Sequence, residues 1–271
     1  MHNKKGLRIL FVGDLVGAPG RVMLERWLPK LREEYQPDGI IVNGENVATN
    51  GRGISRRRAQ ALLAMGVDFI TTGNHIWDQR ETAAYIFEEE RLLRPANFPS
   101  SCPGKSVGFL TCGESTVAII NLQGRTLMRD SLECPFRSME TILTYVKTRT
   151  NIIFLDFHAE ATSEKSAMGS FLDGQVSGIV GTHTHVQTAD ERVLPGGTAF
   201  ISDLGSVCSV NSCIGFTKGP IIQRYLTQMP SRFEVDQDPP YVLSGAYIDV
   251  DRKTGQAIAI ERIKIIDQNA I

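Results

Sequence analysis

Short runs of consecutive apolar residues recur along the chain, and each is about as long as a β-strand. Runs without apolar–polar alternation are typical of strands whose two faces are both buried, as in a parallel sheet. Segments with apolar residues three or four positions apart separate the early runs, as helices do. Strands are therefore predicted within residues 7–14, 38–46, 67–75, 115–124, 151–160, 176–185 and 198–205.

Two helices are predicted between the first three strands. Residues 22–35 carry one apolar face, and Pro29 inside this pattern predicts a kink or a break, because proline removes a backbone donor. Ser55 is placed to cap the second helix, since its hydroxyl can accept from a free backbone N–H group. Gly66 is placed to end that helix.

Two further helices are predicted later in the chain. Asp78 and Glu81 have the spacing of a capping box, so a helix is expected from there to about Leu92. Residues 136–148 place apolar side chains on one stripe, which also predicts a helix. The alternation of strands and helices predicts an α/β fold with much parallel pairing.

The C-terminal part of the chain has a different character. Residues 241–265 indicate two strands joined by a turn at 253–255, which predicts an antiparallel hairpin. Residues 206–240 show no clear periodicity and contain Gly, Pro and polar clusters, so we expect a long loop or lid there. No internal repeat or linker is evident, and a single domain is expected over residues 1–271.

Composition and charge are those of an ordinary globular protein. With 29 Lys and Arg against 30 Asp and Glu, the formal net charge is −1, which gives no electrostatic basis for stable nucleic-acid or membrane binding. The arginines at 56–58 are interpreted as a solvated helix face. No run approaches the roughly 18 apolar residues of a membrane span. The apolar run at 9–12 is too short for a signal peptide.

Cysteine usage predicts a reducing compartment. The number of cysteines is odd and no two are spaced as CxxC, which argues against a disulfide framework and against a cysteine-rich zinc site. Reduced thiols in a cytoplasmic protein are the simplest interpretation. The cysteines are Cys102, Cys112, Cys134, Cys208 and Cys213.

Five of the predicted strands end in residues with carboxylate, amide or imidazole groups. In open α/β sheets, binding sites lie beyond the carboxyl ends of the strands, so these side chains are expected at one edge. Each has a simpler explanation as a turn residue or a satisfied polar pair, but five coincidences at equivalent positions argue for a site. The residues are Asp14, Glu45, Asn46, Asn74, His75, His158, His183 and His185.

The pair His183 and His185 is the strongest single indication of a metal site. Alternate residues of a strand point the same way and can share an ion. The whole set offers nitrogen and oxygen ligands without thiolate, which fits iron, manganese or zinc better than magnesium or calcium. It is too large for one tetrahedral ion and suits two ions about 3.5–4 Å apart, bridged by a carboxylate and a hydroxide.

Such a centre predicts phosphoester hydrolysis. Two ions would lower the pKa of a shared water and neutralise a phosphate as its charge grows, and a histidine outside the metal shell would protonate the leaving oxygen. A phosphomonoesterase, a nuclease and a regulatory scaffold with residual metal binding are the alternatives. A nuclease normally has a basic groove, and the net charge of −1 suggests none. A structural site has no spare acid, whereas His75 is spare, which favours an enzyme.

The motifs that carry this chemistry resemble those of calcineurin-like metallophosphoesterases. "GNH" at 73–75 and "GTHTH" at 181–185 are similar to the GNH[DE] and GHxH blocks of that family. The first block has Asp14 without the usual histidine two residues later, and the second is "NGEN" where GDxxD is common. These departures, with "RPANFP" and "DFHAEATSEK", resemble the YmdB-like branch of bacterial enzymes over nearly the whole chain.

The resemblance implies a four-layer α/β/β/α sandwich with mixed, largely parallel sheets around two transition-metal ions, iron first and manganese or zinc as alternatives. It implies hydrolysis of small phosphodiesters, including 2′,3′- and 3′,5′-cyclic nucleotides, by attack of a hydroxide that bridges the ions. It also suggests a homo-oligomer. The implied roles are one ion for Asp14, Asn46 and His185, a bridge for Glu45, the other ion for Asn74, His158 and His183, and proton donation by His75.

One stretch departs from the YmdB-like pattern. After "SDLG", related sequences usually continue with Met-Thr-Gly, whereas this chain has "SVCSVNSCIG" over Ser206–Gly215. The departure leaves every implied metal ligand in place, but it puts substrate range and assembly contacts in question. Cys208 and Cys213 lie within it and are expected to be free thiols.

Overall fold

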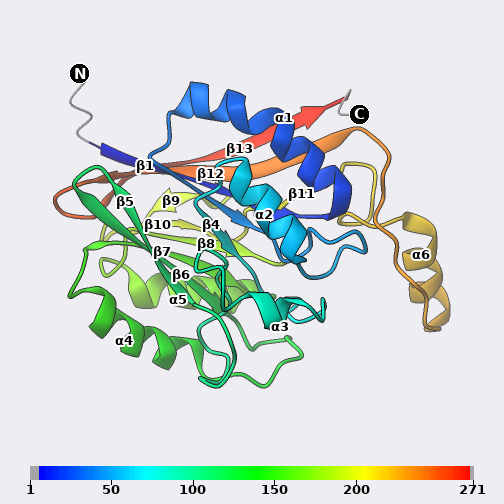
Figure 1. Ribbon diagram of the computed structural model, residues 1–271, viewed down its shortest axis with the longest axis horizontal. Coiled ribbons are helices and arrows are strands. Elements are labelled where there is room, and N and C mark those ends of the chain that lie inside the picture. The colour runs from blue at the N-terminus through cyan, green and yellow to red at the C-terminus, as the bar shows by residue number, and fades with distance from the viewer. Residues whose placement is uncertain (1–5, 269–271) are drawn as a thin grey trace.

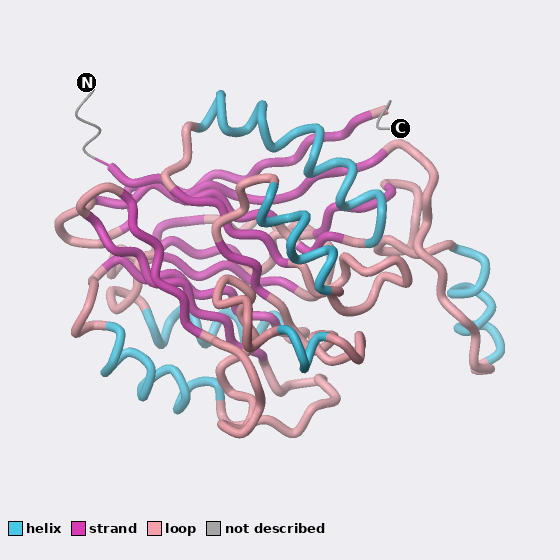
Figure 2. The backbone as a smooth tube through the Cα atoms, viewed as in Figure 1, coloured by secondary structure: helices cyan, strands magenta, loops and turns pink. Residues whose placement is uncertain are grey.

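Residues 6–268 are described by a computed structural model, and the remaining ends of the predicted 1–271 domain lie outside the described residues. Two β-sheets lie face to face, and helices cover the outer side of each sheet (Figure 1). Figure 2 shows the strands gathered in the middle and most helices outside them. The predicted four-layer α/β sandwich is therefore confirmed.

The first sheet contains the N-terminal strands and the C-terminal hairpin. Its strands are β1 (Gly6–Val12), β2 (Asp14–Leu15), β3 (Gly39–Asn43), β4 (Phe69–Thr71), β11 (Ser206–Ser209), β12 (Tyr241–Asp251) and β13 (Ala257–Asp267). Within the described residues the order is β2-β11-β12-β1-β3-β4, with β13 beside β12. β1, β3 and β4 are parallel, whereas β12 is antiparallel to β1 and β13, which confirms the predicted hairpin.

The second sheet is built from the middle of the chain. Its strands are β5 (Val107–Cys112), β6 (Ser115–Gln123), β7 (Ile152–His158), β8 (Gly178–Thr182), β9 (Arg192–Val193) and β10 (Ala199–Ile201). They are arranged as β5-β6-β7-β8-β10-β9, and the strands from β6 to β10 are parallel. Parallel strands bring their carboxyl ends to one edge, so the two sheets together can deliver several loops to one place.

Helices cover the sheets because each presents one apolar stripe. They are α1 (Gly17–Tyr35), α2 (Arg56–Ala64), α3 (Thr82–Tyr85), α4 (Pro135–Val146), α5 (Thr162–Leu172) and α6 (Lys218–Thr227). Side chains of α1 and α2 pack on the first sheet, and those of α4 and α5 pack on the second. A third cluster, with Phe11 and Phe154 5.5 Å apart between ring centroids, fills the space between the sheets.

Two helix predictions differ from the structure. α1 continues through Pro29, because Leu28 and Leu31 are buried on either side and hold that turn against the sheet. The helix predicted from Asp78 to Leu92 is wrong, since only Thr82–Tyr85 is helical there. The carboxylates that suggested a capping box bind elsewhere: that of Asp78 contacts the His75 ring, and that of Glu81 accepts from the backbone of Arg56.

Residues 206–240 are more ordered than the predicted loop, since they contain β11 and α6. α6 stands apart from the layered body (Figure 1), and none of its residues is buried. That residues 206–240 act as a lid stays a prediction. Among the described residues, no helix has the length and apolar character needed to cross a membrane.

Candidate metal centre

All eight residues predicted for the site lie at strand ends or just beyond them. Asp14 begins β2 directly after β1, Glu45 and Asn46 follow β3, and Asn74 and His75 follow β4. The second sheet supplies His158 at the end of β7, and His183 and His185 after β8. The facing sheets thus each contribute part of one cluster, which explains how residues up to 169 positions apart in the chain make contact.

The first group of contacts surrounds Nε2 of His158. This atom lies 3.1 Å from Oε1 of Glu45, 3.0 Å from Oδ1 of Asn74 and 3.0 Å from Nδ1 of His183. One ligand atom each from Glu45, His158 and His183 lies within 4.8 Å of the others, which is close enough for one ion to contact all three. These are the residues implied for one of the two ions, together with the bridge.

The second group lies around His185. Its Nε2 is 3.2 Å from Oδ1 of Asn46, and its Nδ1 is 2.8 Å from the carbonyl oxygen of Ile214. Asp14 is fully buried, and its Oδ1 lies 3.9 Å from Nδ1 of His158. The structure thus brings Asp14 against the first group, while His185 contacts Asn46, and the division of these residues between two ions stays a prediction.

Burial sets opposing pKa shifts in this cluster. Burial lowers the pKa of His158, but the carboxylates of Glu45 and Asp14 outweigh it and raise the value to about 9. Burial likewise raises the pKa of Glu45, but His158 and its neighbouring histidines lower it to about 2. Burial and the positive charge of His158 lower the pKa of His183 to about 3. The buried carboxylates of Glu45 and Asp14 are therefore stabilised by a nearby cation, and protonated His158 is that cation when no metal is bound.

The donor set fits metal ions on a further observation. Oδ1 of Asp14 is buried and has no hydrogen-bond partner among the described residues. Burial raises the pKa of Asp14 well above its ordinary value. Such an oxygen is costly to leave unpaired in a protein interior. A metal ion would satisfy it, and the surrounding imidazole nitrogens and carboxylate oxygens suit iron, manganese or zinc.

The loop that carries His183 and His185 is not an extended strand. β8 ends at Thr182, and the backbone of His183 has φ 103° while that of His185 has φ 65°. The premise that the two histidines alternate along a strand is therefore wrong. Their rings diverge instead, one toward His158 and one toward Asn46, because positive φ values reverse the chain direction.

A buried ion pair holds this loop in place. Nζ of Lys165 lies 2.7 Å from Oδ2 of Asp203, and the two side chains are 3% and 2% exposed. The same carboxylate oxygen accepts from the backbone N–H and the hydroxyl of Thr184, at 3.1 and 2.8 Å. Thr184 is the residue between the two histidines. The sequence patterns did not indicate this anchoring contact of Lys165.

His75 differs from the other histidines in exposure and partner. Its side chain is 25% exposed, and its Nδ1 lies 2.9 Å from Oδ2 of Asp78. Its backbone N–H donates to Oε2 of Glu45 at 3.2 Å, which fixes the ring beside the cluster. Asp78 was not predicted as a site residue because its spacing from Glu81 suggested a helix cap.

Two further contacts orient the histidine rings from outside the cluster. Oε2 of Glu160 lies 3.0 Å from Nε2 of His183, so a half-exposed carboxylate orients that ring from outside. Nδ1 of His158 lies 2.9 Å from the hydroxyl of Thr182, which in turn donates to Asp156 at 2.7 Å. Outer contacts of this kind fix the tautomer and direction of a metal-binding histidine. "HAE" after β7 was the available signal for Glu160.

Gly73 shows why the "GNH" motif begins with glycine. A Cβ atom built on Gly73 would lie 2.3 Å from Nε2 of His158 and 2.4 Å from Oε2 of Glu45. Both are far below contact distance, and both neighbours are buried. Any side chain at this position would occupy the space in which the cluster's ligand atoms meet, so glycine is required by close approach.

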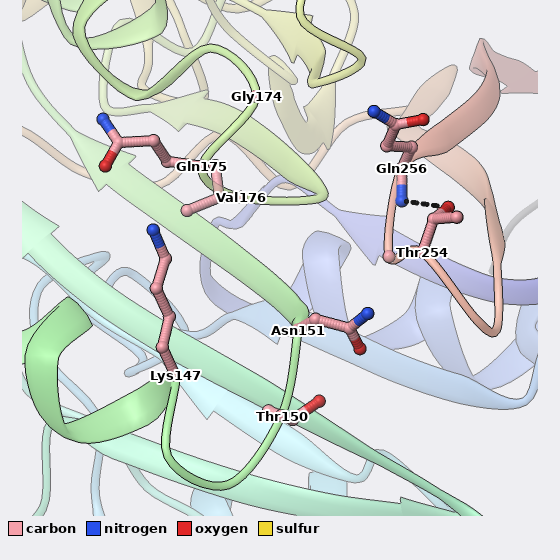
Figure 3. Close-up of a pocket in the computed structure, with 9 residues that line it drawn as sticks. Lys147, Thr150, Asn151, Gly174, Gln175, Val176, Thr254 and Gln256 are labelled. Carbon is pink, nitrogen blue, oxygen red and sulfur yellow. Dashed lines mark hydrogen bonds between the residues drawn. The ribbon is translucent and has the colours of Figure 1, made fainter.

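Two cavities lie at different distances from the cluster. One of about 300 Å³ is at the amino ends of β7 and β8, where Asn151, Gln175 and Gln256 surround it (Figure 3). That is the opposite end of the strands from the cluster, so it is not part of the site. The other, of about 250 Å³, is lined by His185 and is adjacent to the cluster.

Comparison with known proteins agrees with this geometry. A family model described as YmdB-like protein matches residues 10–263. A 2′,3′-cyclic-nucleotide 2′-phosphodiesterase of Bacillus subtilis is 46% identical over 263 residues, covering 97% of this chain and 98% of the relative.

Solved structures agree as well. A structure of a phosphatase from Mycoplasma pneumoniae, 33% identical, superposes with a TM-score of 0.91 and covers 97% of this chain and 94% of its own. A hypothetical protein from Thermus thermophilus, 35% identical, gives a TM-score of 0.89 and covers 96% of this chain and 100% of its own. The chain therefore belongs to the family of YmdB-like proteins.

Proposed function

We propose that this protein is a phosphodiesterase that hydrolyses 2′,3′-cyclic nucleotides, and 3′,5′-cyclic nucleotides as a further substrate class, with two transition-metal ions. The observation that carries the proposal is the meeting of Glu45, Asn74 and His183 within hydrogen-bonding distance of Nε2 of His158. The 46% identity to the Bacillus phosphodiesterase supports the substrate class. When bound, the ions would acidify a water molecule and neutralise the phosphate.

The ligand assignment is the one that the family resemblance implies. Asn74, His158 and His183 are proposed to hold one ion, most simply iron, with manganese or zinc as alternatives. Asp14, Asn46 and His185 are proposed to hold the other. Glu45 is proposed to bridge the ions, and its Oε1 lies 3.1 Å from Nε2 of His158, which supports its contact with the first ion.

His75 is proposed to protonate the leaving oxygen. A general acid must be accessible to substrate and must have a partner that orients its ring. The side chain of His75 is 25% exposed, and Asp78 holds its Nδ1, which directs Nε2 away from Asp78.

A phosphomonoesterase is the second candidate, because the related Mycoplasma pneumoniae protein is described as a phosphatase. A monoester carries one more negative charge than a diester. The exposed groups near the cluster include the acidic side chains of Asp78 and Glu160, whose charges disfavour such a dianion. Diesters are therefore the better substrates in this proposal.

The deciding experiment combines metal analysis with turnover. Purified protein is analysed for metals, and hydrolysis of 2′,3′-cyclic AMP and of a phosphomonoester is assayed before and after chelation. Two metal equivalents with chelator-sensitive diester hydrolysis are expected. Two equivalents with faster monoester hydrolysis would favour the phosphatase. Absence of bound metal, with no activity after adding iron, manganese or zinc, would overturn the proposal in favour of a scaffold.

Three broader expectations remain predictions. A single domain over residues 1–271 is supported by the continuous sandwich over the described part. A cytoplasmic location is supported by the free state of all five cysteines, Cys208 and Cys213 included. The homo-oligomer suggested by the family resemblance is testable by light scattering of the purified protein.

A further inference from the structure

The cavity of about 250 Å³ beside His185 is lined by residues of β11, β12 and β13 of the first sheet. β11 pairs with β2 so that Ser206 lies opposite Asp14, and side chains at such paired positions are on the same face. The hydroxyl of Ser206 donates to the carbonyl oxygen of His185 at 3.2 Å. The floor of the cavity and the metal centre are therefore joined through adjacent strands and one shared histidine.

The walls of this cavity are apolar and unusually exposed. Val186, Ile214 and Ile266 line it and are 59%, 50% and 51% exposed. Val186 follows His185 directly, whereas Ile266 comes from β13, so the exposed apolar groups come from distant parts of the chain. Exposed apolar side chains gathered around one concave site usually mark a ligand or partner contact.

The floor and mouth are polar. Ser244 on β12 and Cys208 on β11 are buried lining residues and form the floor, and Lys264 on β13 is an exposed lining residue at the mouth. This combination suits a flat ligand whose faces are apolar and whose edge carries hydrogen-bonding groups. A nucleobase has that chemistry, because its ring faces pack on aliphatic side chains while its edge atoms accept from hydroxyl and ammonium groups.

The position of Ile214 supports a functional use of the wall. Its backbone has φ 49°, a conformation that β-branched residues rarely adopt. This conformation presents the Ile214 carbonyl to His185 at 2.8 Å while its side chain stays exposed at the cavity. Backbone strain of this kind persists where the surrounding structure needs both contacts. The wall and the proposed metal ligand are thus placed by the same residue.

We propose that this cavity binds the nucleobase of the substrate while the phosphate lies at the metal centre. The inference rests on the proposed phosphodiesterase function and adds the residues that would read the base. Ile214 and Ile266 would pack on the ring faces, and Ser244 and Lys264 would face its edge. Most of one wall comes from Ser206–Gly215, the stretch that departs from the YmdB-like pattern, so base preference is expected to depend on this segment.

The test compares two substrates that share the same reacting bond. 2′,3′-cyclic AMP and glycerol 1,2-cyclic phosphate both contain a five-membered cyclic phosphodiester, but only the first has a base. Ile266→Thr keeps β-branching while replacing apolar surface by a hydroxyl. Ile222→Thr on α6 is the matched control, because Ile222 is also 51% exposed but does not line the cavity.

For cyclic AMP, Ile266→Thr is expected to raise KM about tenfold, the typical effect of a lost apolar contact in a pocket. Its kcat/KM for the glycerol substrate is expected to stay within about twofold of the parent protein, since Ile266 contacts none of the proposed metal ligands. Ile222→Thr is expected to change neither. An unchanged KM for cyclic AMP, or an equal loss on both substrates, would overturn the proposal.

A binding measurement separates this inference from the proposed function. Adenosine, which lacks phosphate, is titrated into the parent protein and into Ile266→Thr by calorimetry, with ribose as the base-free control. Weaker adenosine binding by the variant supports the cavity even if neither cyclic substrate is hydrolysed, a result that would refute only the proposed function. Equal binding of adenosine and ribose by the parent protein would refute the base site whatever the turnover shows.

Discussion

The buried pair between Lys165 and Asp203 gives the sharpest stability prediction, and Lys165→Met is the perturbation. Methionine keeps most of the length and apolar stem of lysine but removes the ammonium group that lies 2.7 Å from the carboxylate. Removing one partner of a buried ion pair destabilises a protein by about 3–5 kcal/mol, because the remaining charge is buried without compensation.

The local contacts place the expected loss at the lower end of this range. Asp203 would keep three donors: the N–H and hydroxyl of Thr184, and the N–H of Gly205 at 2.8 Å. Hydrogen bonds to a charged group contribute about 1.5–3 kcal/mol each. These three donors would therefore offset much of the cost of burying the Asp203 carboxylate without Lys165. We therefore expect Lys165→Met to lower the free energy of unfolding by about 3 kcal/mol.

Urea unfolding of chelated protein, followed by circular dichroism, measures this loss. Arg262→Met is the control, since its ion pair with Glu191 is 36% and 21% exposed and is expected to contribute less than about 1 kcal/mol. The double variant Lys165→Met/Asp203→Asn should lose less than the sum of the single variants, because no unpaired charge remains. A loss below about 1 kcal/mol for Lys165→Met would refute the reasoning.

Three further predictions address the metal centre. His75→Ala is expected to keep both metal equivalents but to lose turnover of diesters with poor leaving groups by roughly 10²-fold or more; steady-state kinetics against a good leaving group checks this. Glu45→Gln is expected to lose at least one metal equivalent by elemental analysis, and two full equivalents would contradict the bridge. The metal-free protein is expected to lose stability from pH 6.5 upward through about pH 9, because folding raises the pKa of His158 from 6.5 to about 9. Urea unfolding midpoints across that pH range measure this loss, and midpoints that do not change with pH would contradict the raised pKa.

Much of the fold followed from local patterns, because strand and helix periodicities reflect which faces are buried. The runs that became β1, β3, β6 and β7 each contain several consecutive apolar residues, as is typical of strands between two layers. The C-terminal hairpin also followed from the sequence pattern. The helix predicted after Asp78 is wrong because the carboxylates of Asp78 and Glu81, which suggested its cap, bind other residues in the folded protein.

The sequence by itself determined which residues are candidates for the metal site, because parallel strands deliver their carboxyl ends to one edge. The family resemblance implied that His183 and His185 belong to different ions, but the positive φ values after β8 that point their rings apart were not predicted. Nor did the sequence show Asp78 behind His75, Lys165 beneath Thr184, or the cavity beside His185. Those arrangements join residues through space, so only the folding of the two sheets against each other decided them.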